Sequence, residues 1–351
     1  MSGGVDSSVM AALMIEAGYD VIAVTMRLGN HDTIEYNSEK PSCCSLEGVE
    51  DARYAAMQLG IPFYAVNHED QFRQSIVDYF VDEYTVGRTP SPCVLCNQDL
   101  KFGTLVDLAD QLDCKYIGTG HYAKIEQDPE TGRYLLRKGS DLKKDQSYFL
   151  FSLTQSQLKR AIMPLGSLNK ETVRGIARRY KLKTAEKPES QELCFIADDD
   201  YKRFLKDRIP EQIQKGEIID QNGEKLGHHK GIPFYTVGQR RGLGIAVGEP
   251  IYVTEIKTET NTIVVGQADE LLRESMIVSQ LNWISFENLT EPIRAKIKIR
   301  YRDQGEMATA TPTADGKVKV IFDQPRRAIA PGQAAVFYDR DLVIGGGWIE
   351  A

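Results

Sequence analysis

The segment Ser2-Gly3-Gly4-Val5-Asp6-Ser7 limits the fold of this chain more than any other feature. Two adjacent glycines let a backbone approach an anion closely, and hydroxyls and helix N-terminal amides can donate hydrogen bonds to that anion. From Asp6 to Ala17 apolar residues recur at helical spacing, and Gly18 is a typical helix stop. The pattern predicts a phosphate-binding loop; the simpler alternative is a Gly-Gly turn with Asp6 and Ser7 as helix caps.

The rest of the first third predicts a parallel α/β sheet. Strand-like runs alternate with amphipathic helical runs over short connections, as in the strand Val21–Met26, the helix Val49–Gly60 and the strand Pro62–Val66. A helix at Leu100–Leu112 and a strand at Tyr116–Gly118 continue the pattern. Ligands bind such sheets at the carboxyl ends of the strands. The loop lacks the lysine of a Walker-type motif, which argues against kinases and GTPases of that type.

The position of the loop is unusual. A phosphate loop of this kind follows a central β-strand, but only Met1 precedes Ser2. We therefore expect a sheet whose first strand is missing. We also expect lower stability, because neighbouring strands lose a hydrogen-bonding partner and apolar cover.

The second half of the chain is β-like and rich in turns. After a helix at Tyr201–Arg208, alternating runs such as Ile293–Tyr301 and Ala334–Tyr338 predict a small antiparallel sandwich or barrel. We predict three domains: an α/β phosphate-loop domain at 1–205, a central β-rich domain at 206–272 and a C-terminal β-barrel-like domain at 273–351.

Composition narrows the class further. The 351 residues carry 43 basic and 50 acidic side chains, a formal net charge of −7, which argues against a simple basic coat protein for nucleic acids. No apolar run reaches the roughly 18 residues that span a membrane, and no secretory signal opens the chain. We expect a cytoplasmic protein with reduced thiols and no membrane partner.

Six cysteines are present, and their settings differ. Cys93 and Cys96 form a C-x-x-C pair that follows two prolines, with a helix expected to begin near Asn97, where a thiol has a lowered pKa. Alone, such a pair is ambiguous between redox chemistry, metal binding and coincidence, and a lone Cys194 is more often structural. We interpret Cys114 and the adjacent pair Cys43–Cys44 as structural.

Several motifs in a fixed order resolve this ambiguity. The opening segment resembles the PP-loop of the ATP pyrophosphatase superfamily. Together with the later segments, the chain resembles the tRNA-specific 2-thiouridylase (tRNA-uridine 2-sulfurtransferase) family over nearly its whole length. The segments that carry the resemblance are Pro92–Asn97, Gly118–Ala123, Lys144–Leu150, Ser190–Ile196, Gly238–Gly244, Arg300–Arg302 and Ala330–Gln333.

The resemblance implies an enzyme that replaces the 2-oxo oxygen of the wobble uridine in tRNA with sulfur. ATP, with Mg²⁺, adenylates that oxygen. Sulfur arrives from a donor protein as a persulfide on Cys194, and Cys96 is the nucleophile, which either closes a disulfide with Cys194 or assists the attack. The implied ATP-binding residues are Ser2, Gly3, Gly4, Val5, Asp6, Ser7, Met26 and Gly120. The implied tRNA-binding residues are Ser91, Pro92, Cys93, His121, Lys144, Asp145, Gln146, Arg300, Tyr301 and Gln333.

Cys93 departs from the family pattern, in which many members carry Asp at this position. It creates a set of three thiols, Cys93, Cys96 and Cys194, that suggests an alternative mechanism through a [4Fe-4S] cluster with one open iron site. Two further alternatives are another PP-loop adenylating enzyme, such as an amidotransferase-linked synthetase or a tRNA 4-thiolation enzyme, and a non-catalytic RNA-binding or iron–sulfur sensor protein.

Two basic runs favour RNA independently of the resemblance. Arg294, Lys296, Lys298, Arg300 and Arg302 alternate and therefore line one face of a strand. The run Lys170–Lys187 places a second basic cluster on a predicted helix. For each run the alternative is an ordinary solvated face.

Overall fold

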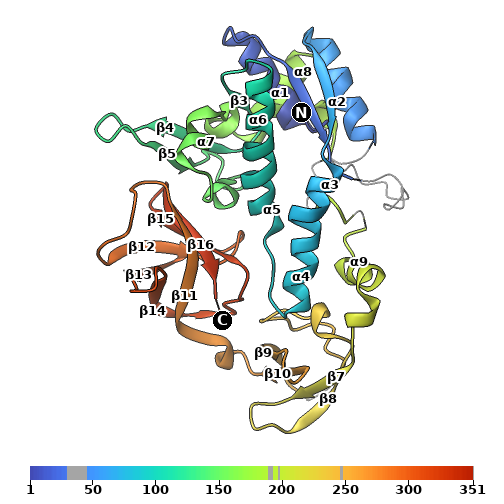
Figure 1. Cartoon of the computed structure of the whole chain (residues 1–351), viewed down its shortest axis with the longest axis vertical. Helices are drawn as coiled ribbons and strands as arrows, with labels where there is room; N and C mark the ends of the chain where they lie inside the picture. Colours follow the sequence, from blue (N-terminus) through green and yellow to red (C-terminus); the bar gives the residue numbers. More distant parts are fainter. Residues whose placement is uncertain (30–45, 189–192, 197, 246–247, 351) are drawn as a thin grey trace. The chain divides into compact units, whose positions relative to one another are not determined.

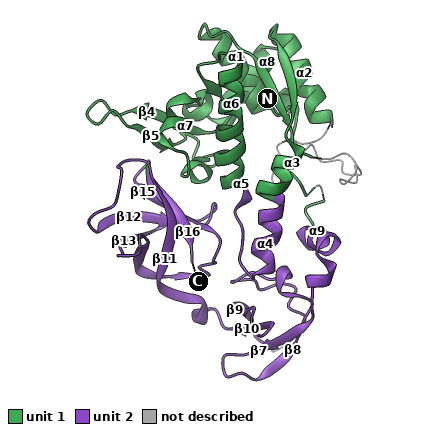
Figure 2. Cartoon of the chain, viewed as in Figure 1, with its two compact units in different colours: residues 1–76, 93–200, 341–343 green, residues 77–92, 201–340, 344–351 purple. Residues whose placement is uncertain are grey.

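The computed structural model describes residues 1–29, 46–188, 193–196, 198–245 and 248–350. The chain divides into two compact units, coloured separately in Figure 2. The first comprises 1–76, 93–200 and 341–343, and the second comprises 77–92, 201–340 and 344–351. The predicted pair Cys43–Cys44 lies outside the described residues.

The first unit has the predicted α/β character (Figure 1). Its helices are α1 (Val5–Glu16), α2 (Leu46–Leu59), α3 (Glu69–Phe72), α5 (Pro92–Leu95), α6 (Leu105–Gln111), α7 (Gln155–Arg160) and α8 (Lys170–Arg179), with the π-helix η2 (Cys96–Thr104) between α5 and α6. Its strands are β1 (Ala23–Arg27), β2 (Phe63–Asn67), β3 (Ile117–Gly118), β4 (Ala123–Gln127), β5 (Tyr134–Lys138) and β6 (Ala161–Ile162).

The strands of the α/β core pair in parallel, as predicted. β1 pairs with β2, with Ala23 opposite Phe63, and β3 pairs with β6, with Ile117 opposite Ala161. These are two separate two-stranded sheets within the described residues. A second, antiparallel element of the unit is the β4–β5 hairpin, to which Val343 adds a short third strand opposite Leu136.

A cavity of about 110 Å³ is lined by residues of both small sheets. Val24 of β1, Ile117 of β3, Met10 of α1 and Leu108 of α6 contribute to its largely apolar wall. At its edge the amino group of Met1 donates a hydrogen bond to the carbonyl of Val24. Burial lowers the pKa of this amino group to about 5.

Extending the chain ahead of Met1 with about eight apolar, β-prone residues should raise the melting temperature. The extension adds apolar cover to the cavity and replaces the buried amine by an uncharged peptide. The sign of the pH effect follows from the lowered pKa of the amine: the unfolded chain binds the extra proton, so the unextended protein loses stability as the pH falls from 8 to 5. The full shift is worth about 4 kcal/mol.

The gain in melting temperature should therefore be larger at pH 5.5 than at pH 8.5. A Gly/Ser extension of equal length is the matched control, because it removes the amine but cannot fill the cavity. That control should remove the part of the pH dependence that comes from the amine and give little stabilisation at pH 8.5. Equal melting temperatures for all three proteins at both pH values would contradict the prediction.

The second unit contains the predicted β structure. Its helices are α4 (Tyr79–Thr85) and α9 (Tyr201–Arg208), the latter at its predicted bounds. A four-stranded sheet has the order β8 (Lys225–His229), β7 (Gly216–Ile219), β10 (Thr262–Gly266), β9 (Tyr252–Lys257). The remaining strands are β11 (Leu272–Trp283), β12 (Ile293–Lys298), β13 (Glu306–Pro312), β14 (Val318–Arg327), β15 (Ala334–Asp339) and β16 (Leu342–Ile349).

Those six strands form a closed barrel, which confirms the predicted C-terminal β-barrel. The order is β11-β14-β13-β12-β15-β16, and β11 closes the ring by pairing with β16, with Val278 opposite Ile349. Side chains alternate between the inside and the outside of the barrel along each strand. On β12, Ala295 and Ile297 are buried in the core, whereas Arg294 and Lys296 are exposed. Closure also leaves the barrel without an open sheet edge.

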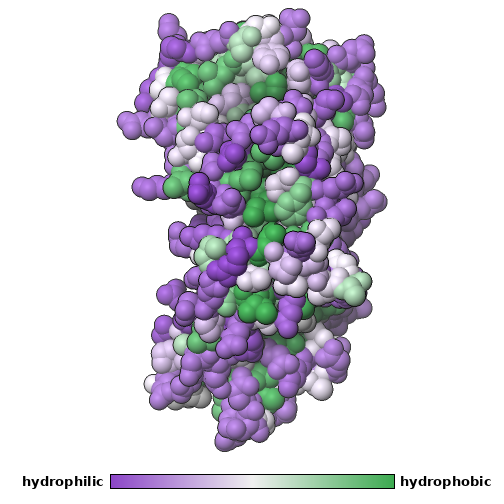
Figure 3. Space-filling model, turned by 90° about the vertical axis from the view of Figure 1, so that its left-hand side faces the viewer, coloured by the Kyte–Doolittle hydropathy of each residue, from purple (hydrophilic) through white to green (hydrophobic). Residues whose placement is uncertain are grey.

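One face of the molecule is mostly polar (Figure 3). On the face drawn in Figure 3, hydrophilic residues predominate and hydrophobic residues lie in patches between them. Within the described residues, none of the helices has the length and apolar character that crossing a membrane requires.

Candidate nucleotide and sulfur-transfer site

The opening loop has the geometry of an anion cradle. Gly3 has a φ of +71°, and a side chain there would place its Cβ 2.2 Å from the carbonyl oxygen of Gly48. Position 3 therefore requires glycine on both conformational and steric grounds. Gly4 is the extended N-cap residue of α1, so the first amides of the helix face this loop without intrahelical acceptors.

Serine hydroxyls hold the loop in shape. The Ser7 Oγ accepts a hydrogen bond from the amide of Ser2 at 3.1 Å and donates to the carbonyl of Gly4 at 3.1 Å. Ser8, which is fully buried, donates to the same carbonyl at 3.0 Å. Because these bonds fix the backbone before any ligand binds, the loop is preorganised for an anion.

Gly120 brings the end of β3 against the loop. A Cβ on Gly120 would lie 2.9 Å from the carbonyl carbon of Asp6 and 3.0 Å from the amide nitrogen of Ser7. Thr25, in the middle of β1 and directly before Met26, donates a hydrogen bond to the carbonyl of Met1 at 2.7 Å, which places the start of the loop beside this strand. The structure thus assembles the predicted nucleotide residues around the carboxyl ends of β1 and β3.

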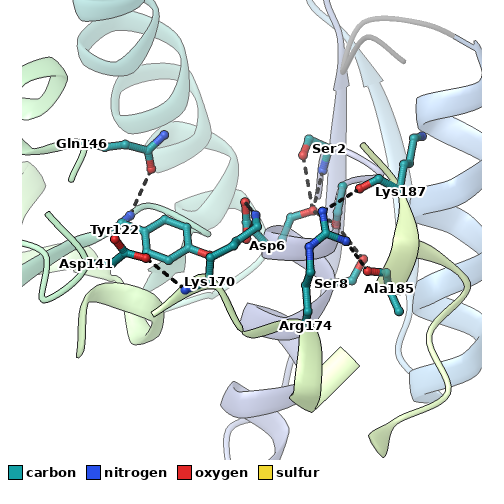
Figure 4. A network of polar contacts seen from close by, with 12 residues as sticks. Ser2, Asp6, Ser8, Tyr122, Asp141, Gln146, Lys170, Arg174, Ala185 and Lys187 are labelled. Carbon is teal, nitrogen blue, oxygen red and sulfur yellow. Dashed lines mark hydrogen bonds and ion pairs between the residues drawn. The ribbon is translucent and has the colours of Figure 1, made fainter. Parts of the chain in front are cut away.

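Two side chains distant in sequence bind the carboxylate of Asp6 (Figure 4). The hydroxyl of Tyr122 donates to Asp6 Oδ1 at 2.7 Å. The Lys170 Nζ lies 2.7 Å from Oδ1 and 2.8 Å from Oδ2. Lys170 is the first residue of α8 and only 13% of its side chain is exposed. The sequence patterns did not connect Lys170 to the loop.

A second ion cluster fixes the segment that precedes Cys194. Asp51 of α2 is buried and binds Lys187 and, at 3.2 Å, Lys183. Burial alone would raise the pKa of Asp51, but the two lysines outweigh it and hold the pKa below its usual value. Arg174 of α8 donates to the carbonyls of Ala185 and Lys187. Sequence reasoning missed this cluster because a single Asp in an amphipathic helix carries no signal.

The cysteine helix begins earlier than predicted. α5 starts at Pro92, not near Asn97, because proline suits the first helical position. The helix N-terminus therefore lies at Cys93, which is exposed, whereas Cys96 is buried one turn further on, at the start of the π-helix η2. Cys194 is half-buried. π-helical turns are frequent at functional sites.

The thiols give no support to the cluster alternative. Within the described residues, which include Cys93, Cys96 and Cys194, no three His, Cys, Asp or Glu side chains are grouped so that they could hold a metal ion. The described residues therefore do not support a [4Fe-4S] cluster at these thiols.

His121 is a buried, uncharged histidine. Its Nδ1 lies 3.0 Å from the Thr119 hydroxyl, and its ring lies 6.1 Å from that of Phe102. Burial and the charge of Lys101 lower the pKa of His121 well below its usual value. At neutral pH the ring is a hydrogen-bonding group rather than a cation.

The segment Lys144–Gln146 is largely engaged in its own loop. The buried carboxylate of Asp145 accepts hydrogen bonds from the amides of Gly139 and Ser147, each at 3.1 Å. Gln146 accepts from the amide of Tyr122 at 3.0 Å. Lys144 is partly exposed. The tRNA roles of these three residues stay predictions.

In the second unit, the turn at Gln333 is hydrogen-bonded to Thr89 and Pro90, which precede Cys93 in the chain. The Gln333 side chain donates to the carbonyls of Thr89 and Pro90 at 3.1 and 2.9 Å. The amide of Thr89 donates in return to the carbonyl of Pro331 at 2.8 Å. Ser91 is buried beside this clamp. Gln333 thus fixes the backbone at Thr89 and Pro90, just ahead of Ser91, and its tRNA contact stays a prediction.

The two basic runs differ in how their charges are used. On β12 the predicted outward face is confirmed: Arg294 pairs with Asp323, whereas Lys296 has no acidic partner in the described part of the barrel. The strand ends at Lys298, three residues before the predicted end, so Arg300 and Tyr301 lie in the following turn.

In the run Lys170–Lys187, most of the charges are engaged in internal contacts. Arg178 pairs with Glu186 and Arg179 with Glu16, beside the contacts of Lys170, Lys183 and Lys187 already described. Packing within the first unit therefore accounts for most of the charges of this run.

A preorganised phosphate loop at the edge of a parallel α/β unit, in one chain with a closed β-barrel, defines a PP-loop nucleotide-binding enzyme. Three family models match successive segments: tRNA methyl transferase HUP domain at 1–198, tRNA methyl transferase PRC-barrel domain at 202–267 and aminomethyltransferase beta-barrel domain at 273–349.

Curated relatives match along the whole chain. The tRNA-specific 2-thiouridylases MnmA of Symbiobacterium thermophilum, Carboxydothermus hydrogenoformans and Clostridioides difficile are 49%, 48% and 47% identical to it; each match covers 100% of this chain and 90%, 96% and 96% of the relative. The chain belongs to the tRNA-specific 2-thiouridylase family, which is a family of sulfurtransferases.

A solved structure described as a predicted subunit of tRNA methyltransferase from Methanocaldococcus jannaschii is a weaker match. It is 16% identical, with a TM-score of 0.30, over 60% of this chain and 85% of that one. A likeness at this level bears on neither fold nor function.

Proposed function

We propose that this enzyme replaces the 2-oxo oxygen of the wobble uridine of tRNA with sulfur, using ATP. One observation carries the proposal: the anion cradle built by Gly3 and Gly120 belongs to the same compact unit as Cys96 and Cys194. Adenylation requires the anion cradle, and sulfur transfer requires the two cysteines. The names of the relatives support uridine thiolation in tRNA.

The chemistry follows in two parts. The uridine 2-oxygen attacks the α-phosphorus of ATP and pyrophosphate leaves, which turns a poor leaving group into AMP. The terminal sulfur of a Cys194 persulfide then attacks C2 of the base and AMP leaves. Finally the Cys96 thiolate attacks the Cys194 sulfur and breaks the bond to the transferred atom, so that a Cys96–Cys194 disulfide forms and 2-thiouridine is released. A thiol reductant returns the two electrons that reset the cysteines.

The residues present fit a nucleotide. The loop has the glycine backbone, the hydroxyls and the helix N-terminus that bind a phosphate chain. The Mg²⁺ that accompanies ATP is held mainly by phosphates and water and needs only one or two carboxylates. It would offset phosphate charge.

The partners in this proposal are the anticodon loop of tRNA and a protein that donates persulfide sulfur to Cys194. Anticodon bases are single-stranded and are recognised by stacking and splayed-out bases, with basic groups for the phosphates. We place the reaction in the cytoplasm as part of the same proposal.

Mass spectrometry of wobble uridine tests the function directly. Cells that lack this gene should lose 2-thiouridine at the wobble position and regain it when the wild-type gene is restored. Loss of 4-thiouridine instead would indicate the 4-thiolation alternative. Unchanged thiouridine in all tRNAs would refute the proposal.

Changing Lys296, Lys298 and Arg300 together to glutamine should weaken tRNA binding and flatten its salt dependence. Each lost phosphate contact lowers the slope of log K against log salt by about one. Binding is measured by filter retention from low to moderate salt. The matched control changes three exposed lysines of the first unit, Lys115, Lys159 and Lys181, to glutamine. Equal slopes for both triple variants would count against the β12 surface.

A further inference from the structure

The phosphate loop contains no lysine, although the ligand it is shaped for is highly anionic. Backbone amides and hydroxyls supply hydrogen bonds but no full positive charge. Moreover, the loop itself carries a carboxylate, Asp6, in the first turn of α1. That negative charge opposes an incoming phosphate chain unless a cation offsets it.

Lys170 supplies that cation. Its Nζ lies 2.7 and 2.8 Å from the two carboxylate oxygens of Asp6. Further contacts set the position of Lys170. Its ammonium lies 5.6 Å from the centre of the Tyr122 ring, and the backbone amide of Lys170 donates to the Asp141 carboxylate at 3.1 Å. α1 and α8 share one apolar cluster, in which Val9 of α1 and Val173 of α8 are fully buried. The helix packing therefore holds the lysine at the loop.

A second basic residue of α8 is used differently. Arg174 lies one turn after Lys170, and its guanidinium is bound to the carbonyls of Ala185 and Lys187. Figure 4 shows the two side chains leaving the same helix, with Lys170 directed to Asp6 and Arg174 to the segment 185–187. Of the two, Lys170 is the one bound to a residue of the loop.

We propose that Lys170 does for this loop what the loop lysine does in a Walker-type motif: it binds the pyrophosphate moiety of the nucleotide. In the structure the ammonium pairs with Asp6, and on nucleotide binding it is shared between Asp6 and the phosphate oxygens. This inference rests on the proposed function in one respect, which is that the loop binds ATP.

The test is equilibrium binding of ATP, inorganic pyrophosphate and AMP to the full chain in the absence of tRNA. Lys170→Met should lower the affinity for ATP and for pyrophosphate roughly tenfold or more, which is the effect of losing one charge-assisted hydrogen bond. The affinity for AMP should change by less than about twofold. Lys170→Arg should restore most of the affinity. Lys159→Met, on the exposed face of α7, is the matched control and should bind all three ligands as the wild type does.

A double variant separates direct contact from neutralisation. If Lys170 only cancels the charge of Asp6, then Asp6→Asn with Lys170→Met should bind pyrophosphate as the wild type does, and that result would overturn the proposal. We expect the double variant to stay weak. A thermal melt shows whether Lys170→Met alone fails to fold. If it does, the double variant still tests the proposal, because it leaves no unpaired carboxylate at position 6.

The outcomes also separate this inference from the proposed function. A wild type that binds ATP, with a Lys170→Met variant that binds it equally, would remove the lysine role and leave the function standing. A wild type that binds neither ATP nor pyrophosphate would overturn both.

Discussion

Replacing Cys194 by serine should abolish 2-thiouridine formation, with a loss of activity on the order of 10³-fold or more, as when a covalent nucleophile is removed. A hydroxyl cannot carry a persulfide, so no sulfur reaches the base. Cys194 is only half-buried, and serine differs from cysteine by one atom, so the fold should be unaffected. The measurement is 2-thiouridine formed per enzyme on unmodified tRNA, with ATP and a persulfide donor.

Cys96→Ser should give the same loss at a different step. This variant should still load sulfur on Cys194, which intact-protein mass spectrometry detects as one added sulfur atom, but it should not release it as product. Cys194→Ser should load no sulfur there. Both variants should still consume ATP to adenylate tRNA, because the nucleotide loop is untouched.

Two further cysteines serve as controls. Cys114→Ser should be fully active, because its thiol is directed at the carbonyl of Leu112, at 3.6 Å, in a packing environment. Cys93→Ser should retain activity, because the proposed reaction uses two thiols. An inactive Cys93→Ser enzyme with intact ATP binding would contradict the two-thiol route.

Replacing Gly3 by alanine should remove nucleotide binding, and it should also destabilise the first unit. A residue with a side chain at a φ of +71° costs about 1–2 kcal/mol, and the added Cβ would lie 2.2 Å from the backbone of Gly48, so either the loop or α2 must move. Nucleotide binding then has to restore the strained loop conformation. Because each 1.4 kcal/mol of binding free energy is a factor of ten in affinity, the affinity for ATP should fall at least ~10-fold. Calorimetric titration with a non-hydrolysable ATP analogue and a thermal melt measure the two effects.

Gly175→Ala is the matched control for that change. Gly175 is an exposed residue in the middle of α8, and an added Cβ would meet nothing within 4 Å. This variant should bind the nucleotide normally and be more stable by about 0.5–1 kcal/mol, the usual gain from alanine over glycine in a helix. Normal ATP affinity in Gly3→Ala would show that the cradle is not the nucleotide site.

Local patterns in the sequence were sufficient for much of the architecture. The helix Tyr201–Arg208 has its predicted bounds, and β1 and β2 lie within two residues of theirs, since hydrophobic spacing reports directly on helical and extended geometry. Alternation along β12 correctly predicted its basic outer face. The displaced start of the cysteine helix, at Pro92, shows that a proline can begin a helix as readily as precede it.

The compact units, in contrast, do not follow the order of the chain. Residues 77–92 belong to the second unit although the chain on both sides of them belongs to the first. A contiguous domain map cannot express this, because the unit to which a segment belongs depends on what it packs against.

The sequence by itself determined the chemical parts: a glycine–serine loop at the start of a helix, the cysteines, and the order of motifs that places the chain in its family. Only the tertiary structure decided which residues act on those parts. Lys170 reaches Asp6 across 164 positions, Gly120 meets the loop backbone, and Gln333 binds the carbonyl of Thr89 across 244. Sequence periodicity encodes the local path of the backbone, whereas such pairings depend on how helices and strands pack, and they have no period from which to be predicted.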